Sequence, residues 1–127
     1  MSDLEQNKRT VLEFFELAFN QKRLEEAVER YVNPSYTQHN PQVADGPEGL
    51  LAFGRLMIAQ FPNMKLEFKR VIAEGDLVSL HVHGKPSPDD RGIVSMDIFR
   101  LEDGKLIEHW DVSQEVPESA ANDNGMF

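Results

Sequence analysis

The polar pattern of one hairpin constrains this chain more than any other feature of its sequence. Residues 97–111 read DIFRLEDGKLIEHWD, two β-rich runs divided by a Glu-Asp-Gly turn at 102–104. Side chains alternate along a strand, so His109 and Asp111 share one face with Ile107. The hairpin therefore holds either a polar cluster or scattered surface charge.

The geometry of the turn decides whether Asp97 joins these groups. A three-residue loop with Gly104 in the left-handed region places Asp97 opposite His109, on the same face. A two-residue loop shifts the register by one residue and turns Asp97 to the other face. Both alternatives are open at the level of sequence.

Helical spacing dominates the first half of the chain. A helix is predicted from Ser2, as the N-cap of a capping box with Glu5, to about Asn20. A second helix covers residues 24–31 and ends before a proline. A third starts at the Asp-Gly-Pro-Glu sequence and covers about 45–61.

Strand patterns replace helical ones from residue 65 onward. Residues 36–41 look extended or loop-like, and strands are predicted over 65–72, 77–83, 93–101 and 106–112. Helices first and strands later predict the α+β class, with an antiparallel sheet against the helices. We expect a single domain over residues 1–127, in which 113–127 form a polar C-terminal tail.

Composition excludes several classes of function. The net charge of −9 and the dispersed Lys and Arg residues argue against nucleic acid or an anionic membrane as partner. The absence of cysteine removes disulfides, thiolate metal sites and cysteine nucleophiles. Neither a signal peptide nor an apolar run of ~18 residues is visible, so we expect a soluble, cytoplasmic protein.

The candidate chemistry centres on the hairpin. His109 and Asp111 lie roughly 7 Å apart along a strand, and a carboxylate near an imidazole raises its basicity and orients it. Asp97 in a dry cavity would have a raised pKa and could donate a proton. The alternatives are a structural pair at the end of the sheet and an Asp97 that is simply paired with Arg or His.

Three further histidines are candidates. His81 and His83 share a strand face, where they could line a pocket, lie in solvent or bind metal; the spacing is specific to no metal. His39 is either a loop histidine or an acid, base or donor at a pocket rim. No nucleophile elbow, phosphate loop or dinucleotide fingerprint is present, which favours chemistry without a cofactor, or plain binding.

Three segments resemble one known family. They are Tyr36-Thr-Gln-His-Asn-Pro41 with Asp45-Gly46, residues 73–78 (AEGDLV), and residues 97–112. Together they resemble the SnoaL-like proteins of the nuclear-transport-factor-2-like superfamily, and the resemblance extends over nearly the whole chain, including the tail.

The resemblance implies a cone-shaped α+β fold, in which a curved antiparallel sheet wraps around a long helix and leaves a deep apolar pocket. Such proteins are commonly homodimers through the outer sheet face. Family members include polyketide cyclases that close a ring by intramolecular aldol condensation without a cofactor, with an aspartate as acid/base. Ketosteroid isomerases share the fold and hold a pocket aspartate in an Asp-x-Phe-Arg strand. On that analogy Asp97, Ile107, His109 and Asp111 point inward. No carboxylate stands at His39-Asn40, where the isomerases hold their base.

Our leading hypothesis is a cofactor-independent enzyme acting on an apolar, carbonyl-bearing molecule. Asp111 or Asp97 would protonate the developing oxyanion, and His109 would take the α-proton. No metal or cofactor is assigned, and a homodimer is expected. The alternatives are a non-catalytic ligand-binding module and a histidine-rich metal hydrolase. The remaining pocket residues are predicted to be His39, His81, His83, Tyr36, Phe15, Phe19, Phe53 and Phe99.

Overall fold

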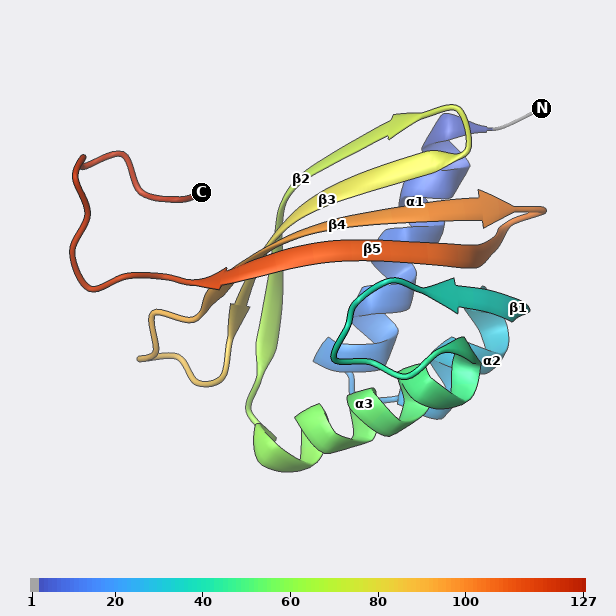
Figure 1. Ribbon diagram of the computed structural model, residues 1–127, viewed down its shortest axis with the longest axis horizontal. Helices are drawn as coiled ribbons and strands as arrows, with labels where there is room; N and C mark the ends of the chain where they lie inside the picture. Colours follow the sequence, from blue (N-terminus) through green and yellow to red (C-terminus); the bar gives the residue numbers. More distant parts are fainter. Residues whose placement is uncertain (1–2) are drawn as a thin grey trace.

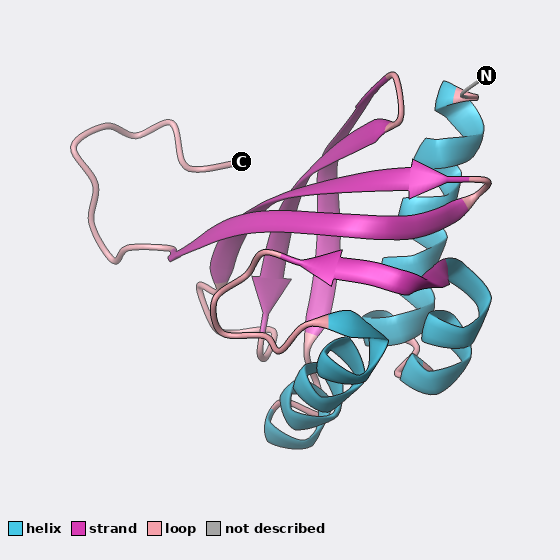
Figure 2. Ribbon diagram, turned by 45° about the vertical axis from the view of Figure 1, so that its right-hand side comes forward, coloured by secondary structure: helices cyan, strands magenta, loops and turns pink. Residues whose placement is uncertain are grey.

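A curved five-stranded sheet carries all the helices on one side (Figures 1 and 2). The computed structural model describes residues 3–127. Its elements are α1 (Leu4–Phe15), a π-helical turn (Glu16–Asn20), α2 (Leu24–Tyr31), β1 (Val32–Gln38), α3 (Gly46–Gln60), β2 (Lys65–Glu74), β3 (Leu77–Lys85), β4 (Ile93–Glu102) and β5 (Lys105–Glu115). The predicted α+β class and the three predicted helices are confirmed. None of the helices in residues 3–127 has the length and apolar character needed to cross a membrane.

The sheet is mixed rather than purely antiparallel. Its strand order is β1-β5-β4-β3-β2, in which β2 to β5 form an antiparallel meander. β1 pairs in parallel with the free edge of β5, and Gln38 lies beside His109. The extended segment near residue 36 was expected, but its place in the sheet was not. A parallel partner needs a long crossover connection, which the intervening chain supplies.

The helix starts follow the polar residues that precede them. At α1, Asp3 is the N-cap and its side chain accepts from the backbone N–H of Gln6. The predicted cap at Ser2 falls outside the described residues. At α3, the Asp45 carboxylate accepts from Gly46 N–H and also from Gln38 N–H. Asp45 thereby ties the start of α3 to the end of β1, close to the candidate site.

The β4–β5 hairpin closes through a two-residue turn. Asp103 and Gly104 both have positive φ, 50° and 77°, and Glu102 pairs directly with Lys105. Consecutive positive φ values are typical of a type I′ turn, whose twist matches that of the strands. Of the two loops that the sequence leaves open, the structure has the two-residue one.

A β-bulge beside the turn restores the expected face of the polar groups. The pairing of β4 with β5 slips by one residue at Ile107, which has no partner of its own. One extra residue reverses the alternation of every side chain beyond it. Asp97 therefore shares a face with His109 and Asp111, although the turn has two residues. Leu106, and not Ile107 as predicted, takes the fully buried inward position.

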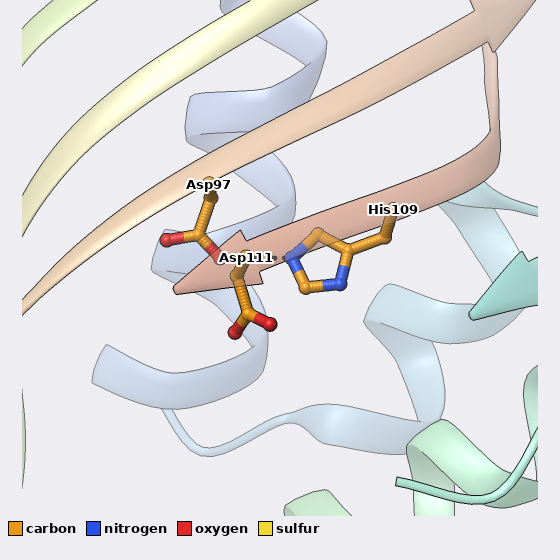
Figure 3. Close-up of side chains that lie close together, drawn as sticks. All are labelled: Asp97, His109 and Asp111. Carbon is orange, nitrogen blue, oxygen red and sulfur yellow. Dashed lines mark hydrogen bonds and ion pairs between the residues drawn. The ribbon is translucent and has the colours of Figure 1, made fainter. Parts of the chain in front are cut away.

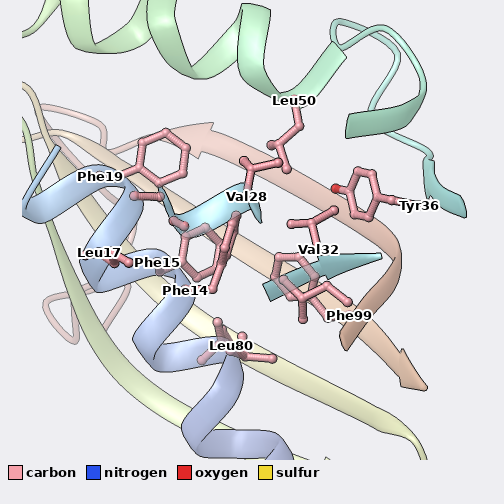
Figure 4. Close-up of a cluster of buried hydrophobic side chains, with 14 of the residues drawn as sticks. Phe14, Phe15, Leu17, Phe19, Val28, Val32, Tyr36, Leu50, Leu80 and Phe99 are labelled. Carbon is pink, nitrogen blue, oxygen red and sulfur yellow. The ribbon is translucent and has the colours of Figure 1, made fainter. Parts of the chain in front are cut away.

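The core lies between α1 and the concave face of the sheet (Figure 4). Phe14, Leu80 and Phe99 are among its fully buried side chains. Phe15 and Phe99 meet edge to face with ring centroids 5.4 Å apart, an arrangement favoured by aromatic quadrupoles. β5 continues to Glu115, so residues 113–115 belong to the strand and not to the predicted tail.

Candidate active site

Asp97, His109 and Asp111 meet on the concave side of the sheet (Figure 3). Asp97 and Asp111 are direct cross-strand partners on β4 and β5. His109 Nε2 lies 2.8 Å from Asp97 Oδ1, and one ligand atom from each residue lies within 4.8 Å of the others. Asp97 is only 5% exposed and His109 only 7%. The hairpin thus brings three titratable groups together, of which Asp97 and His109 are buried and Asp111 is half-buried.

Gln38 holds the other side of the imidazole. Its Oε1 lies 2.8 Å from His109 Nδ1 and also accepts from the backbone N–H groups of Asn40 and His39, at 3.0 and 3.1 Å. Its Nε2 donates to the Tyr36 hydroxyl at 2.9 Å. Our sequence reasoning missed Gln38, because only the parallel pairing of β1 with β5 brings it beside His109. The spacing of Tyr36 and Gln38, two residues apart on one strand, was the available signal.

Asn40 contacts the second carboxylate. Its Nδ2 donates to Asp111 Oδ1 at 2.8 Å. Within residues 3–127, Asp111 Oδ2 makes no hydrogen bond and is the unpaired oxygen of the cluster. Burial raises the pKa of Asp111; the carboxylate of Asp97 adds to this, while His109 and the Asn40 hydrogen bond oppose it.

These groups line a chamber of about 80 Å³. Four predicted pocket phenylalanines lie in its wall, and Tyr36 faces it from β1. Burial raises the pKa of Tyr36, and the nearby carboxylates of Asp111 and Asp97 raise it further. The phenol therefore stays protonated over the physiological range. The wall comprises Phe14, Phe15, Phe19, Phe53, Phe99, Val43 and Leu50, with Tyr36, Gln38, Asn40, Asp97, His109 and Asp111.

The geometry opposes the direct role predicted for His109. Both ring nitrogens are hydrogen-bonded, one to Asp97 and one to Gln38. A substrate could take a nitrogen of this ring only by displacing one of these partners. Among the described residues of the cluster, the one that lines the chamber with a carboxylate oxygen free of hydrogen bonds is Asp111.

His81 and His83 do not line the chamber, contrary to the prediction. Their neighbours Leu80 and Val82 are buried on the inner face, so strand alternation turns both imidazoles outward. There His81 Nε2 donates to the carbonyl of Met126 at 2.8 Å, and His83 stacks on Phe127 with centroids 4.0 Å apart. Their other partners are Arg70, which lies 3.0 Å from His81 Nδ1, and the carbonyl of Arg91, which accepts from His83 Nε2 at 2.7 Å.

His39 also lies outside the chamber. Its ring is parallel to that of Trp110, with centroids 4.9 Å apart, and Nε2 lies 2.6 Å from Glu108. Glu108 is paired in turn with Arg100. Trp110 and Glu108 flank His109 in sequence and therefore face the opposite side of β5. The residue that enters the site from this loop is the next one, Asn40.

The cluster would also suit a divalent cation, since two carboxylates and an imidazole are ordinary ligands. His109 and Asp97 are hydrogen-bonded to each other, however, so a cation would have to replace that bond. The arrangement as it stands is that of a hydrogen-bonded acid–base pair beside a second carboxylate.

Solved structures with the same architecture define the class of protein. A protein assigned as a SnoaL-like polyketide cyclase from Jannaschia sp. CCS1 superposes with a TM-score of 0.73 at 22% identity, over 89% of this chain and 91% of the other. TsrD from Streptomyces laurentii gives 0.75 at 24% identity, over 89% and 91%. A protein assigned as a ketosteroid isomerase from Kribbella flavida gives 0.74 at 20% identity, over 96% and 87%. Identities this low show the fold alone, so the class is that of α+β domains in which a curved sheet carries its helices on one face.

Within this class the family is established by sequence. Residues 11–109 match the SnoaL-like domain, so the chain belongs to the SnoaL-like family. The comparison with curated proteins found no match. The resemblance stated from the sequence motifs is confirmed at the level of the family.

Proposed function

We propose that the chain is a cofactor-independent acid/base enzyme that acts on an apolar carbonyl compound, by isomerisation or intramolecular aldol closure. One observation carries the proposal: Asp111, which has one carboxylate oxygen without a hydrogen bond in residues 3–127, and Tyr36 line the same small, phenylalanine-walled chamber. Structural similarity to cyclases and isomerases supports this general class of chemistry.

Tyr36 would bind the carbonyl oxygen. Its hydroxyl accepts a hydrogen bond from Gln38 Nε2, which leaves its own hydrogen available to the chamber. A neutral phenol fixed before the reaction stabilises a developing oxyanion, and more strongly where water is excluded. The raised pKa of Tyr36 keeps this donor in place.

Asp111 would carry the proton. Its carboxylate removes the α-proton, the C–H electrons form the enolate double bond, and negative charge moves to the oxygen held by Tyr36. The enolate carbon, or its vinylogous position, then takes the proton back in an isomerisation. In an aldol closure it attacks a second carbonyl of the same molecule, and Asp111 protonates the new alkoxide. Both sequences are redox-neutral, and the raised pKa of Asp111 suits a group that both accepts and returns a proton.

The chamber admits only the reacting end of a substrate. Pockets for drug-sized ligands measure ~300–1,000 Å³, whereas this chamber measures about 80 Å³. A larger, mostly apolar hollow of about 440 Å³ lies further along the concave face, near Leu66, Gly84 and Ile93. We infer that the apolar body of the substrate lies in this hollow while the carbonyl reaches the chamber.

Deuterium exchange tests the proposal without knowledge of the true substrate. The protein is incubated in D2O with acetone, cyclopentanone or acetophenone, and deuterium at the α-carbon is followed by NMR. Wild type should accelerate exchange of at least one ketone above the buffer rate, and Asp111→Asn should abolish the acceleration. Asp89→Asn, an exposed loop substitution, is the matched control and should exchange like wild type.

A non-catalytic ligand-binding module is the alternative function. The hydrogen bonds of His109 favour it. Both ring nitrogens are already bonded, one to Gln38 and one to Asp97, so the imidazole has no nitrogen left for a substrate. Ketones that raise the melting temperature while wild type and Asp111→Asn exchange them at the buffer rate would establish this alternative.

We also propose that the chain forms a homodimer through the outer face of the sheet. Apolar side chains are exposed there on adjacent strands, with Met96 directly opposite Val112 and Ile98 directly opposite Trp110. A contiguous exposed apolar patch is typical of an interaction site, and a second copy offers the same patch around a two-fold axis. We call this the outer patch: Ile72, Leu77, Met96, Ile98 and Val112.

A further inference from the structure

We propose that Gln38 locks the tautomer of His109, so that Asp97 and His109 hold one shared proton and Asp111 alone exchanges a proton with the substrate. The catalytic part of this inference, the role of Asp111, rests on the proposed function. The structural part, the tautomer of His109, rests only on the hydrogen bonds described below.

The orientation of the Gln38 amide is fixed by the backbone. Its Oε1 accepts from the N–H of Asn40, and it shares the N–H of His39 with the backbone carbonyl of His109. A flipped amide would direct its own N–H bonds at these donors, and donors do not bond donors. The amide nitrogen therefore faces the Tyr36 hydroxyl, where the structure has it. The orientation of the amide is therefore set by backbone donors on one side and by the Tyr36 hydroxyl on the other.

A fixed acceptor determines the protonation of the ring. Gln38 Oε1 lies 2.8 Å from His109 Nδ1, and a carbonyl oxygen only accepts. Nδ1 therefore carries a hydrogen whether the ring is neutral or charged, since the hydrogen bond at one nitrogen sets the state of the other. Only Nε2 is left to gain or lose a proton.

Nε2 faces the carboxylate of Asp97 at 2.8 Å, in a buried setting. One proton lies between these atoms, either on the ring, beside an ionised Asp97, or on the carboxyl, beside a neutral ring. Both forms have zero net charge. Loss of the proton would set a carboxylate against a nitrogen lone pair, and a buried unpaired charge is costly. Asp97 Oδ2 is also engaged, by the Ser95 hydroxyl at 2.7 Å.

The two carboxylates that face each other on β4 and β5 therefore have different roles. Asp97 is engaged by His109 and Ser95, whereas Asp111, which lines the chamber, has one carboxylate oxygen without a partner in residues 3–127. Gln38 is thus a positioning residue, and it acts through His109 and Asp97 rather than on the substrate.

Long-range 1H–15N correlation spectra of the histidine rings test the lock directly. The protein has four histidines, and His109→Gln identifies the ring of interest. In wild type, His109 Nδ1 should carry its proton throughout the pH range in which the protein is folded. In Gln38→Leu, which has no acceptor, a form with bare Nδ1 and protonated Nε2 should appear.

A rescue and a control complete the experiment. Gln38→Glu keeps an acceptor at the same place and should restore the Nδ1–H pattern, which a merely space-filling role would not predict. Gln60→Leu, on the exposed end of α3, should match wild type. A wild-type ring with bare Nδ1, or a Gln38→Leu ring identical to that of wild type, would overturn the lock. If Gln38→Leu does not fold, wild type and Gln38→Glu still decide.

The histidine spectra test the tautomer of His109, and the ketone exchange tests the proposed function, so either prediction can be refuted without the other. Where exchange is present, Gln38→Leu should slow it by about 10- to 100-fold, the cost typical of losing a group that orients a functional histidine. A locked ring without exchange would remove the proposed function and leave the lock intact. Exchange with an unlocked ring would do the reverse.

Discussion

Asp97 and Asp111 lie directly opposite each other on β4 and β5, with both carboxylates on the buried side of the sheet. Like charges at such positions destabilise a sheet. Each carboxylate has a different hydrogen-bond partner: Asp97 contacts His109, and Asp111 accepts from Asn40. The Asn40 amide carries no charge and cannot neutralise a carboxylate. Burial raises the pKa of Asp111, and the repulsion between the two carboxylates therefore raises it further.

Replacing Asp111 with asparagine should stabilise the protein at neutral pH. The pKa of Asp111 is raised in the folded state, so its favourable contribution is complete below the unfolded pKa of ~3.9 and is lost as pH rises through the folded pKa. Asparagine has nearly the same side-chain shape but does not ionise, so the variant does not lose stability in this way as the pH rises. Urea denaturation at about pH 4 and about pH 7.5 should show the variant gaining on wild type at the higher pH. An equal difference at both pH values would contradict the raised pKa.

Tyr36→Phe should reduce catalysis more than binding. The variant removes the proposed oxyanion donor and leaves the ring in the wall of the chamber. Loss of one such donor costs roughly a hundredfold or more in kcat, so the rate of ketone exchange should fall by about that factor while ketone affinity changes little. Tyr31→Phe provides the control, because its hydroxyl bonds Glu13 on the helical side, away from the chamber. Equal rates in the two variants would remove Tyr36 from the mechanism.

Two leucine substitutions should separate core from surface. Leu80 is fully buried under α1, and Leu80→Ala should lower the free energy of unfolding by about 2–5 kcal/mol through lost burial and a residual cavity. Leu56, on α3, is 52% exposed, and Leu56→Ala should change stability by about 0.5 kcal/mol or less. Chemical denaturation of both variants measures the difference. Similar costs at the two sites would place the core elsewhere.

The outer patch should determine the oligomeric state. Val112 is 77% exposed opposite Met96, so the double substitution Met96→Glu and Val112→Glu would place repelling charges in the proposed interface. Sedimentation equilibrium should find a dimeric wild type and a monomeric variant. Leu56→Glu introduces the same charge on α3 and should remain dimeric. A monomeric wild type at micromolar concentration refutes the dimer.

Removal of metal should leave the protein unchanged. The hydrogen bond between Asp97 and His109 needs no ion, and neither proposed proton transfer uses one. Elemental analysis of protein purified without an affinity tag should find no stoichiometric transition metal, and dialysis against EDTA should alter neither ketone exchange nor melting temperature. A bound ion in proportion to protein, with loss of exchange on chelation, would favour the metal-hydrolase alternative.

Much of the architecture could be predicted because its determinants are local. The start of α3 is predicted by the capping residue Asp45 and by Pro47, whose φ is fixed. The helix begins at Gly46 in the structure. Alternation of apolar and polar residues likewise predicted the antiparallel meander. The histidines were harder to place: His81 and His83 share a face as expected, but alternation alone does not say which face of the sheet is buried.

The site itself depended on contacts between distant segments. Gln38 could not be assigned from sequence, because its role exists only where β1 pairs with β5 across an interval of 71 residues. The inward face expected for Asp97 proved correct although the turn has two residues, because the bulge at Ile107 shifts the register by one more residue.

The sequence by itself determined the class of fold, the order of its elements and the family, because helix caps, turn residues and side-chain periodicity act over a few neighbouring positions. Only the tertiary structure decided which polar groups meet. Whether a strand gains one residue at a bulge, and which edge accepts a parallel partner, depends on the packing of the whole sheet against its helices. The bulge and the parallel pairing set His109 between Asp97 and Gln38 and, within residues 3–127, leave one oxygen of Asp111 without a hydrogen bond.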